Sequence, residues 1–317
     1  SYTGRSNDLN DLTENSQPDR RRYALFVGCT VAYKLPHLEA ATRYVMDALG
    51  IYPVDLPFSC CPDPNGVHSY NSEIWYTLAA RNLALAEEQA LDIVTLCSGC
   101  YATLKHSREL LNKDPGLQKR INGRLKSAGR HYTGESRVFH LYQLLYEQIG
   151  YERLQQLVVK PLHDLRIAVH YGCHSLRPKQ MNPPENSEHP QWLWQFADQV
   201  LGAETAHYLD ESQCCGAGLR EVDQDTALAL TQRKIEQIEE VGANALLVPC
   251  PTCYLQFDVG QRLLKRSDNN AITGTAVFYQ TELLAIAMGA QPESIGMQFH
   301  MIKPDLNLLQ SKKAKSA

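Results

Sequence analysis

The sequence lacks three features that would each assign it to a familiar class. None of its 317 residues lie in an apolar run close to the roughly 20 residues that a membrane-spanning helix needs, so we expect no membrane span. Basic and acidic side chains number 31 and 35, and the net charge of −4 argues against a nucleic-acid partner. The glycine-rich fingerprint of dinucleotide-binding proteins is also missing.

The two ends of the chain are polar. Residues 1–22 contain two leucines as their only aliphatic side chains, so they have no apolar segment of the kind found in signal peptides. We therefore expect a cytoplasmic protein in which residues 1–22 form a flexible arm. Lys312, Lys313 and Lys315 form a short basic tail, which we expect to be solvated.

Cysteine is unusually abundant. The chain contains ten: Cys29, Cys60, Cys61, Cys97, Cys100, Cys173, Cys214, Cys215, Cys250 and Cys253. In a cytoplasmic protein, which we expect here, many cysteines indicate a metal or redox site more often than a disulfide scaffold.

Apolar runs alternate with amphipathic segments. Strands are predicted at 23–27, 93–96, 165–171 and 246–248, with an extended segment at 51–58. Helices are predicted at 36–49, 72–90, 101–111, 190–201 and 226–241, and Ser72 is the expected N-cap of the second. This alternation predicts an α/β fold with mostly parallel strands and flanking helices.

The cysteines form a repeat. Each half has a cysteine preceded by glycine, then a Cys-Cys pair, then Cys-x-x-Cys. The pair recurs after 154 positions and the Cys-x-x-Cys after 153, and every cysteine of the chain is used. We infer two pseudo-symmetric units, over residues 23–150 and 151–317.

Each unit is expected to bring five sulfurs together, because loops at the carboxyl ends of parallel strands meet at one edge. Four kinds of site remain possible. Disulfides would leave one thiol unpaired per half, four-cysteine zinc sites would leave one unused, and thiol exchange needs only one Cys-x-x-Cys. Iron–sulfur clusters fit best because thiolates are their usual ligands, although a regular cubane takes only four.

The two motifs resemble the cysteine-rich CCG domain, and their tandem arrangement is similar to the B subunit of heterodisulfide reductase and its bacterial relatives. The likeness covers about residues 22–300. Its residues are Tyr23-Ala24-Leu25-Phe26-Val27-Gly28-Cys29-Thr30, His170-Tyr171-Gly172-Cys173-His174-Ser175-Leu176-Arg177-Pro178, Cys214-Cys215-Gly216-Ala217-Gly218 and Pro249-Cys250-Pro251-Thr252-Cys253-Tyr254-Leu255-Gln256-Phe257-Asp258. One departure is Pro62, which follows the first Cys-Cys pair where the motif has glycine.

The resemblance implies two non-cubane 4Fe–4S clusters, each held by the five cysteines of one unit. It also implies an oxidoreductase that cleaves a disulfide or carrier-bound sulfur with two electrons, or catalyses the reverse reaction. The implied partners are the ferredoxin-like C subunit and the flavin-bearing A subunit of such a complex. Two alternatives stay open: an electron-transfer component of a lactate- or glycolate-utilisation or dehydrogenase complex, and a non-catalytic cluster scaffold.

His174 is the candidate catalytic residue outside the cysteines. It directly follows Cys173, and the titration range of an imidazole suits proton donation to a leaving thiolate. The alternative is a hydrogen bond to backbone or sulfur. Arg177 and Lys179 follow closely and could attract an acidic substrate, or could simply lie in a solvated loop.

Overall fold

The computed structural model describes residues 21–62, 66–177, 187–267 and 272–310. It contains two four-stranded sheets whose strands all pair in parallel, in the orders β2-β1-β3-β4 and β6-β5-β7-β8. The strands are β1 (Arg21–Phe26), β2 (Ile51–Val54), β3 (Ile93–Thr95), β4 (Val138–His140), β5 (Arg166–Val169), β6 (Glu204–Thr205), β7 (Ala245–Val248) and β8 (Ala276–Tyr279). The predicted α/β class with two similar units is confirmed.

Helices cover the sheets, which explains why central strands such as β3 and β7 are buried along their whole length. The helices are α1 (Cys29–Lys34), α2 (Pro36–Ala48), α3 (Val67–Tyr70), α4 (Ser72–Glu87), α5 (Ser98–Lys113), α6 (Pro115–Leu125), α7 (Leu141–Gln143), α8 (Tyr151–Leu157), α9 (Cys173–Leu176), α10 (Trp192–Gln195), α11 (Gln224–Glu240), α12 (Pro251–Ser267) and α13 (Gln280–Ala287). Short π- and 3-10-helical segments are η1 (Lys126–Ala128), η2 (Leu144–Ile149), η4 (Phe196–Val200), η5 (Ala217–Leu219), η6 (Pro292–Ile295), η7 (Met297–Phe299) and η8 (Leu306–Leu309). None of the helices in the described ranges is long and apolar enough to cross a membrane.

The strand order places the cysteine loops together. In each sheet the chain runs from the central strand to one side and then crosses to the other, so the order reverses between β1 and β3, and between β5 and β7. The crevice at the carboxyl ends of such a strand pair is where α/β sheets bind ligands. Cys29 follows β1 and Cys97 follows β3, while Cys173 and Cys250 follow the corresponding strands of the second sheet.

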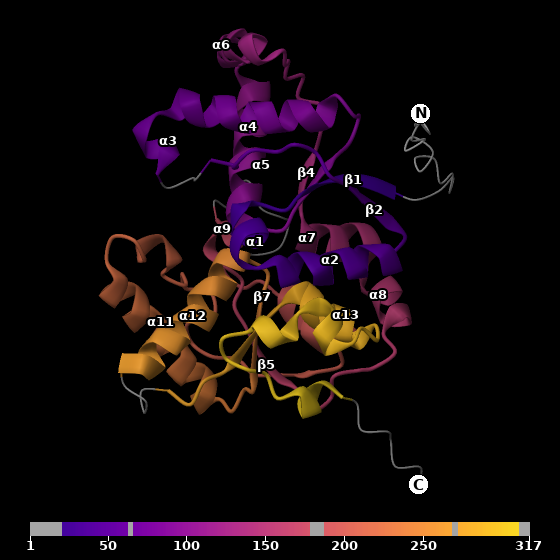
Figure 1. The fold of residues 1–317 in the computed structure, drawn as a ribbon, viewed down its shortest axis with the longest axis vertical. Coiled ribbons are helices and arrows are strands. Elements are labelled where there is room, and N and C mark those ends of the chain that lie inside the picture. Colours follow the sequence, from indigo (N-terminus) through magenta and orange to yellow (C-terminus); the bar gives the residue numbers. More distant parts are fainter. Residues whose placement is uncertain (1–20, 63–65, 178–186, 268–271, 311–317) are drawn as a thin grey trace, which may run out of the picture.

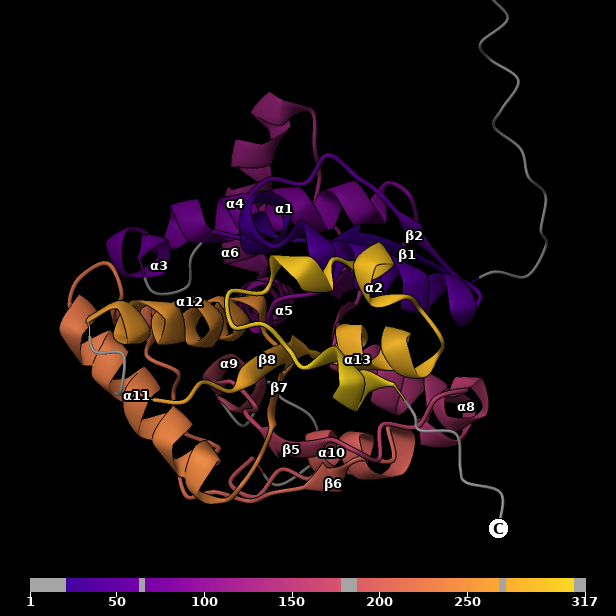
Figure 2. The ribbon, with the colours of Figure 1, turned by 60° about the horizontal axis from the view of Figure 1, so that its bottom comes forward.

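The two units pack against each other and share one hydrophobic core. α2 of the first unit lies beside α13 of the second (Figure 1 and Figure 2), and Thr42 Oγ1 lies 3.0 Å from Thr281 Oγ1 in this contact. The cysteine-bearing helices cross over in a similar way: α1 contacts α12, and α9 contacts α5. Each unit's first cysteine therefore lies on a helix that touches the Cys-x-x-Cys helix of the other unit.

Three predicted boundaries need correction. Arg21 and Arg22 belong to β1, so the segment before the first sheet ends earlier than the expected arm over 1–22. The N-cap of α4 is Asn71 rather than Ser72, since the Asn71 side chain accepts a hydrogen bond from the amide of Ile74. The helix expected over 190–201 begins at Trp192 and becomes π-helical from Phe196. The rest of the arm and the lysines of the basic tail lie outside the described residues.

Candidate metal centre

The five cysteines of the first unit meet at one end of its sheet. Cys29 begins α1, Cys60 and Cys61 lie in the loop after β2, and Cys97 and Cys100 stand at the start of α5. Their thiols interact in sequence: Cys29 with Cys60, Cys60 with Cys61, Cys61 with Cys100, and Cys100 with Cys97. All five are free thiols.

The second unit repeats this arrangement. Cys173 Sγ lies 4.0 Å from Cys214 Sγ. Cys214 interacts with Cys215, Cys215 with Cys253, and Cys253 with Cys250. These five are also free thiols, so the structure disagrees with a disulfide framework in either unit. The predicted convergence of each set of cysteine loops is present in both units.

A glycine lets each first-cysteine loop approach the last cysteine of its unit. Gly28 and Gly172 have φ values of 79° and 78°, which residues other than glycine rarely adopt. A Cβ atom on Gly28 would lie 3.1 Å from Cys100 Sγ, and one on Gly172 would lie 3.6 Å from Cys253 Sγ. The glycine before each first cysteine is therefore explained by the close approach of backbone to sulfur.

The crowded sulfurs favour thiolates at selected positions. Contacts with neighbouring thiols, that of Cys100 foremost, lower the pKa of Cys61 to about 5. In the second unit, contact with Cys173 lowers the pKa of Cys214 far below its usual value, and the same contact raises that of Cys173. Metals bind the thiolate form, so these contacts act in the direction that metal binding requires at Cys61 and Cys214.

The two sulfur groups adjoin. Cys97 Sγ and Cys250 Sγ lie 3.9 Å apart although they are 153 positions apart in the chain, and both are buried. Contacts with Cys253 and Cys97 lower the pKa of Cys250 well below its usual value. Beside this contact, Ser98 Oγ lies 2.7 Å from Ser175 Oγ of the other unit. The first cysteine of each Cys-x-x-Cys is therefore the point where the units meet.

Part of each group reaches solvent. Cys29, Cys60 and Cys214 are exposed and Cys173 is partly exposed. A cavity of about 290 Å³ lies at the first unit's open end, and Cys29, Cys60, Phe26 and Phe58 are among its lining residues. A small molecule can thus approach the outer cysteines, whereas the inner ones are enclosed.

His174 lies between the two units. It is partly buried on α9. A Cβ atom added to Gly99 would be 3.6 Å from His174 Nδ1 and 3.8 Å from Cys97 Sγ, so this imidazole sits beside the first unit's Cys-x-x-Cys although it follows a cysteine of the second. Arg177 is exposed at the end of α9, and Lys179 lies outside the described residues.

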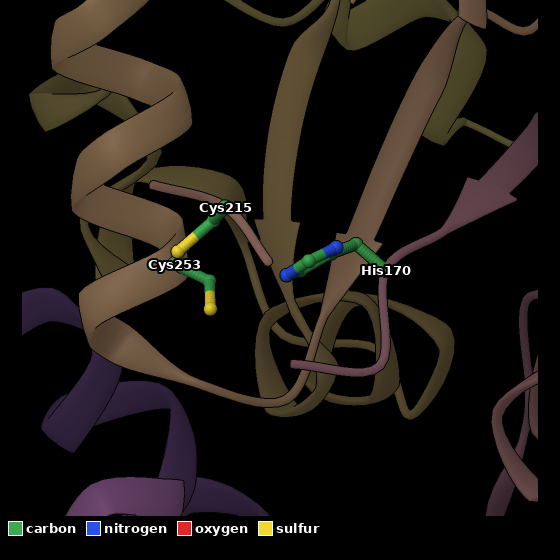
Figure 3. A group of neighbouring side chains, drawn as sticks. All are labelled: His170, Cys215 and Cys253. Carbon is green, nitrogen blue, oxygen red and sulfur yellow. The ribbon is translucent and has the colours of Figure 1, made fainter. Parts of the chain in front are cut away.

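Sequence reasoning assigned no role to His170 or Lys234. His170 is buried and groups with Cys215 and Cys253, their ligand atoms lying within 4.8 Å of one another (Figure 3). Lys234 of α11 is also buried, and its Nζ lies 3.2 Å from His170 Nδ1. Burial lowers the pKa of Lys234 to about 8, and burial also lowers the pKa of His170. The repeat could have pointed to His170, because the two units differ at this position: the residue two places before the glycine is Phe26 in the first unit and His170 in the second.

A second buried polar group lies at the contact between α2 and α13. His300 Nε2 lies 2.9 Å from Glu282 Oε1, and His37 Nε2 lies 4.0 Å from the same oxygen. The hydroxyl of Tyr254 lies 3.3 Å from His37 Nε2. The spacing of His37, Glu282 and His300 would suit a metal ion. However, the Nε2 atoms of the two histidines already have hydrogen-bond partners.

The donor set fits iron–sulfur clusters better than single metal ions. Five thiols in each unit, with an imidazole beside the second set, exceed the four ligands of a structural zinc site. Thiolates are the usual ligands of iron–sulfur clusters, and backbone amides near sulfur are a usual feature of their surroundings. Here the amide of Gly216 donates to Cys214 Sγ at 3.4 Å.

Comparisons with known proteins agree with the duplicated motif. The family model of the cysteine-rich CCG domain matches residues 23–105 and again 167–258. The chain is 33% identical to the B subunit of the ferredoxin:CoB-CoM heterodisulfide reductase of Methanosarcina mazei, over 89% of this chain and 94% of that protein. It is 28% identical to the membrane anchor subunit of the 8-methylmenaquinol:fumarate reductase of Wolinella succinogenes, over 89% of this chain and 98% of that protein.

Among solved structures, a hypothetical protein from Helicobacter pylori shares the fold. It superposes with a TM-score of 0.72 at 18% identity, over 90% of this chain and 53% of that one. A heterodisulfide reductase B-subunit-like protein of Archaeoglobus profundus is 33% identical, over 86% of this chain and 93% of that protein. The repeated motif, its two matches to one domain model and the 33% identity to B subunits over most of the chain agree. The chain belongs to the family of heterodisulfide reductase B subunits and carries the cysteine-rich CCG domain twice.

Proposed function

We propose that this chain is the iron–sulfur subunit of a heterodisulfide reductase-like complex and catalyses the two-electron reduction of a disulfide or carrier-bound sulfur, or the reverse oxidation. Each unit would hold one non-cubane 4Fe–4S cluster with its five cysteines. The observation that carries the proposal is that every cysteine belongs to one of two equivalent five-thiol groups, which meet at Cys97 and Cys250.

The duplication matches the chemistry of the substrate. An iron–sulfur centre supplies or accepts one electron at a time when bound. Reducing a disulfide to two thiolates takes two electrons, so two adjacent one-electron sites suit one S–S bond. The 3.9 Å contact between Cys97 and Cys250 keeps the sites adjacent.

The substrate would approach from the outer cysteines, because the inner ones are buried. Cys29 and Cys60 line the cavity of the first unit, and Cys214 is exposed in the second. His174 is the proposed proton donor to the leaving thiolate. It follows Cys173 of the second unit and lies beside Gly99 and Cys97 of the first, and an imidazole is a common general acid in proteins.

Electrons would come from other proteins. We propose a ferredoxin-like C subunit and a flavin-bearing A subunit as partners, in the cytoplasm. Relatives at 33% identity are named as the B subunits of a ferredoxin:CoB-CoM and of a ferredoxin/F(420)H(2)-dependent CoB-CoM heterodisulfide reductase, which supports a role inside a multi-subunit complex.

A second candidate function is electron transfer within a dehydrogenase or a lactate- or glycolate-utilisation complex. The observation in its favour is the similarity to the Wolinella succinogenes protein, whose name refers to fumarate and not to a disulfide. In that role the same cysteines would pass electrons without binding a sulfur substrate.

Anaerobic purification followed by metal analysis tests the proposal. We expect about eight iron and about eight sulfide per chain, as two four-iron clusters require. Adding a disulfide to the reduced protein should change its paramagnetic resonance spectrum and release thiol, whereas fumarate or a hydroxy acid should have no effect. His174→Gln should keep the iron and slow thiol release, while His131→Gln, at an exposed histidine, should behave like wild type. Stoichiometric zinc, or a response to fumarate or hydroxy acid alone, would contradict the proposal.

A further inference from the structure

The two units differ at the strand end that leads into the first cysteine. In the first unit Phe26 stands two residues before Gly28, and in the second unit His170 stands two residues before Gly172. Both side chains are buried, at 1% and 0% exposure. Phe26 lines the same cavity as Cys29 and Cys60 of the first site, and His170 lies beside Cys215 and Cys253 of the second.

The helices that support the Cys-Cys loops also differ between the units, and again the second unit has the more basic side chain. In the first unit Asn82 of α4 donates its amide to the carbonyl of Cys60 at 3.1 Å. In the second unit Lys234 of α11 donates to the carbonyls of Asp210 and Gln213, the latter at 2.9 Å, just before the Cys-Cys pair. Both side chains hold the loop in place, but only the second introduces an ammonium group next to the sulfurs.

Lys234 also determines which nitrogen of His170 carries the proton. An ammonium group has only donors, so His170 Nδ1, 3.2 Å from Lys234 Nζ, must accept the hydrogen bond. The proton of the neutral ring is then on Nε2. Among the described residues this buried Nε2 makes no hydrogen bond of normal geometry, although the Glu211 backbone lies near the ring. The ring extends toward Cys215 and Cys253 (Figure 3). A buried donor without an acceptor is unfavourable, so a sulfur acceptor at this place completes the site.

We propose that His170 donates an N–H···S hydrogen bond to the sulfur group of the second unit and, with Lys234, makes the iron–sulfur centre held there easier to reduce than that of the first unit. This inference rests on the proposed function. Hydrogen bonds to cluster sulfurs and nearby positive charge both favour the reduced, more negative state. His170 and Lys234 are positioning residues that act through Cys215 and Cys253, and electrons would collect in the second unit.

Redox titration of the full-length, iron-loaded protein by paramagnetic resonance tests this inference. Wild type should show two separate midpoint potentials. His170→Phe, which gives the second unit the side chain of the first, should lower the higher potential by about 59 mV, a tenfold change in a one-electron equilibrium, and leave the lower one unchanged. Lys234→Gln should shift the same potential in the same direction. Phe26→Leu, at the equivalent position, is the matched control and should leave the higher potential unchanged.

Iron content separates the possible failures. If His170→Phe retains full iron but both potentials stay as in wild type, the inference is wrong and the proposed function stands. If wild type itself binds no iron, both fail. If the variants do not fold, pulsed paramagnetic resonance of wild type containing ¹⁵N-histidine still decides: a weak coupling to one imidazole nitrogen supports the hydrogen bond. No coupling, or the strong coupling of direct iron–nitrogen ligation, overturns it.

Discussion

The first site depends on the absence of a Cβ atom at Gly28. Its φ of 79° and ψ of 156° lie in a region that only glycine adopts readily, and a Cβ would come within 3.1 Å of Cys100 Sγ. We expect Gly28→Ala to displace the Cys100 sulfur and to lower the iron content from about eight toward about four per chain, as measured by anaerobic iron analysis.

Gly50 provides the matched control for this substitution. It also has a positive φ, of 70°, but an added Cβ would meet nothing within 4 Å. Gly50→Ala should therefore cost only the backbone strain, about 1 kcal/mol, and appear as a lower Tm with full iron content. Full iron in Gly28→Ala would show that the close approach to Cys100 is not required.

Cys214 tests whether the two sites bind iron independently. It is an exposed cysteine of the second unit and takes no part in the buried contact between Cys97 and Cys250. We expect Cys214→Ser to remove about half of the iron, since four-iron clusters would be lost one at a time. Cys60→Ser, its counterpart in the first unit, should remove the other half and leave a different paramagnetic resonance signal. Complete loss of iron in either variant would contradict two separate sites.

At the scale of elements, the start of α4 is a local test of the structure. Two polar residues stand side by side there, and the sequence alone favoured Ser72. The structure instead gives Asn71 an extended conformation and a 3.0 Å hydrogen bond from the amide of Ile74. We expect Asn71→Ala to cost about 1 kcal/mol of unfolding free energy, because an N-cap bond is lost.

Thermal unfolding of Asn71→Ala and Ser72→Ala under anaerobic conditions checks this assignment. Ser72→Ala should have little effect, because Ser72 already lies inside the helix and its side chain is exposed. A larger loss of Tm in Ser72→Ala than in Asn71→Ala would restore the N-cap assignment made from the sequence.

At the scale of the whole molecule, the buried contact between α2 and α13 depends on ionisation. Burial alone would lower the pKa of His300, but the charge of Glu282 and its hydrogen bond outweigh burial and raise it above its usual value. Asp258 raises the same pKa and Lys303 lowers it. His37, by contrast, has its pKa lowered by burial.

The sign of the expected pH dependence follows from the raised pKa of His300. A histidine that binds its proton more tightly when folded stabilises the protein fully below the unfolded pKa of about 6.5, and this contribution is lost as pH rises through the folded pKa. The Tm difference between wild type and His300→Gln should therefore be larger near pH 6 than near pH 9. His131→Gln, at an exposed position, should show no such trend. A difference that grows with pH would mean that Glu282 does not hold the proton on His300.

The sequence alone predicted the α/β class, the strands that correspond to β1, β3, β5 and β7, the duplication and the convergence of five cysteines in each unit, but it did not predict β4, β6, β8 or α13. The predicted features depend on local apolar patterns and on repeated spacing, and both can be read from one sequence. The role of Arg21 and Arg22 in β1 was missed because pairing with β2, and not local apolarity, makes them part of a strand.

Only the tertiary structure decided which residues of the two units touch. The contact of Cys97 with Cys250, the position of His174 beside Gly99, the pairing of His170 with Lys234 and the group formed by His37, Glu282 and His300 all join segments far apart in the chain. The physical reason is that these contacts depend on how whole helices and sheets pack together, and neither periodicity nor spacing along one chain encodes that packing directly.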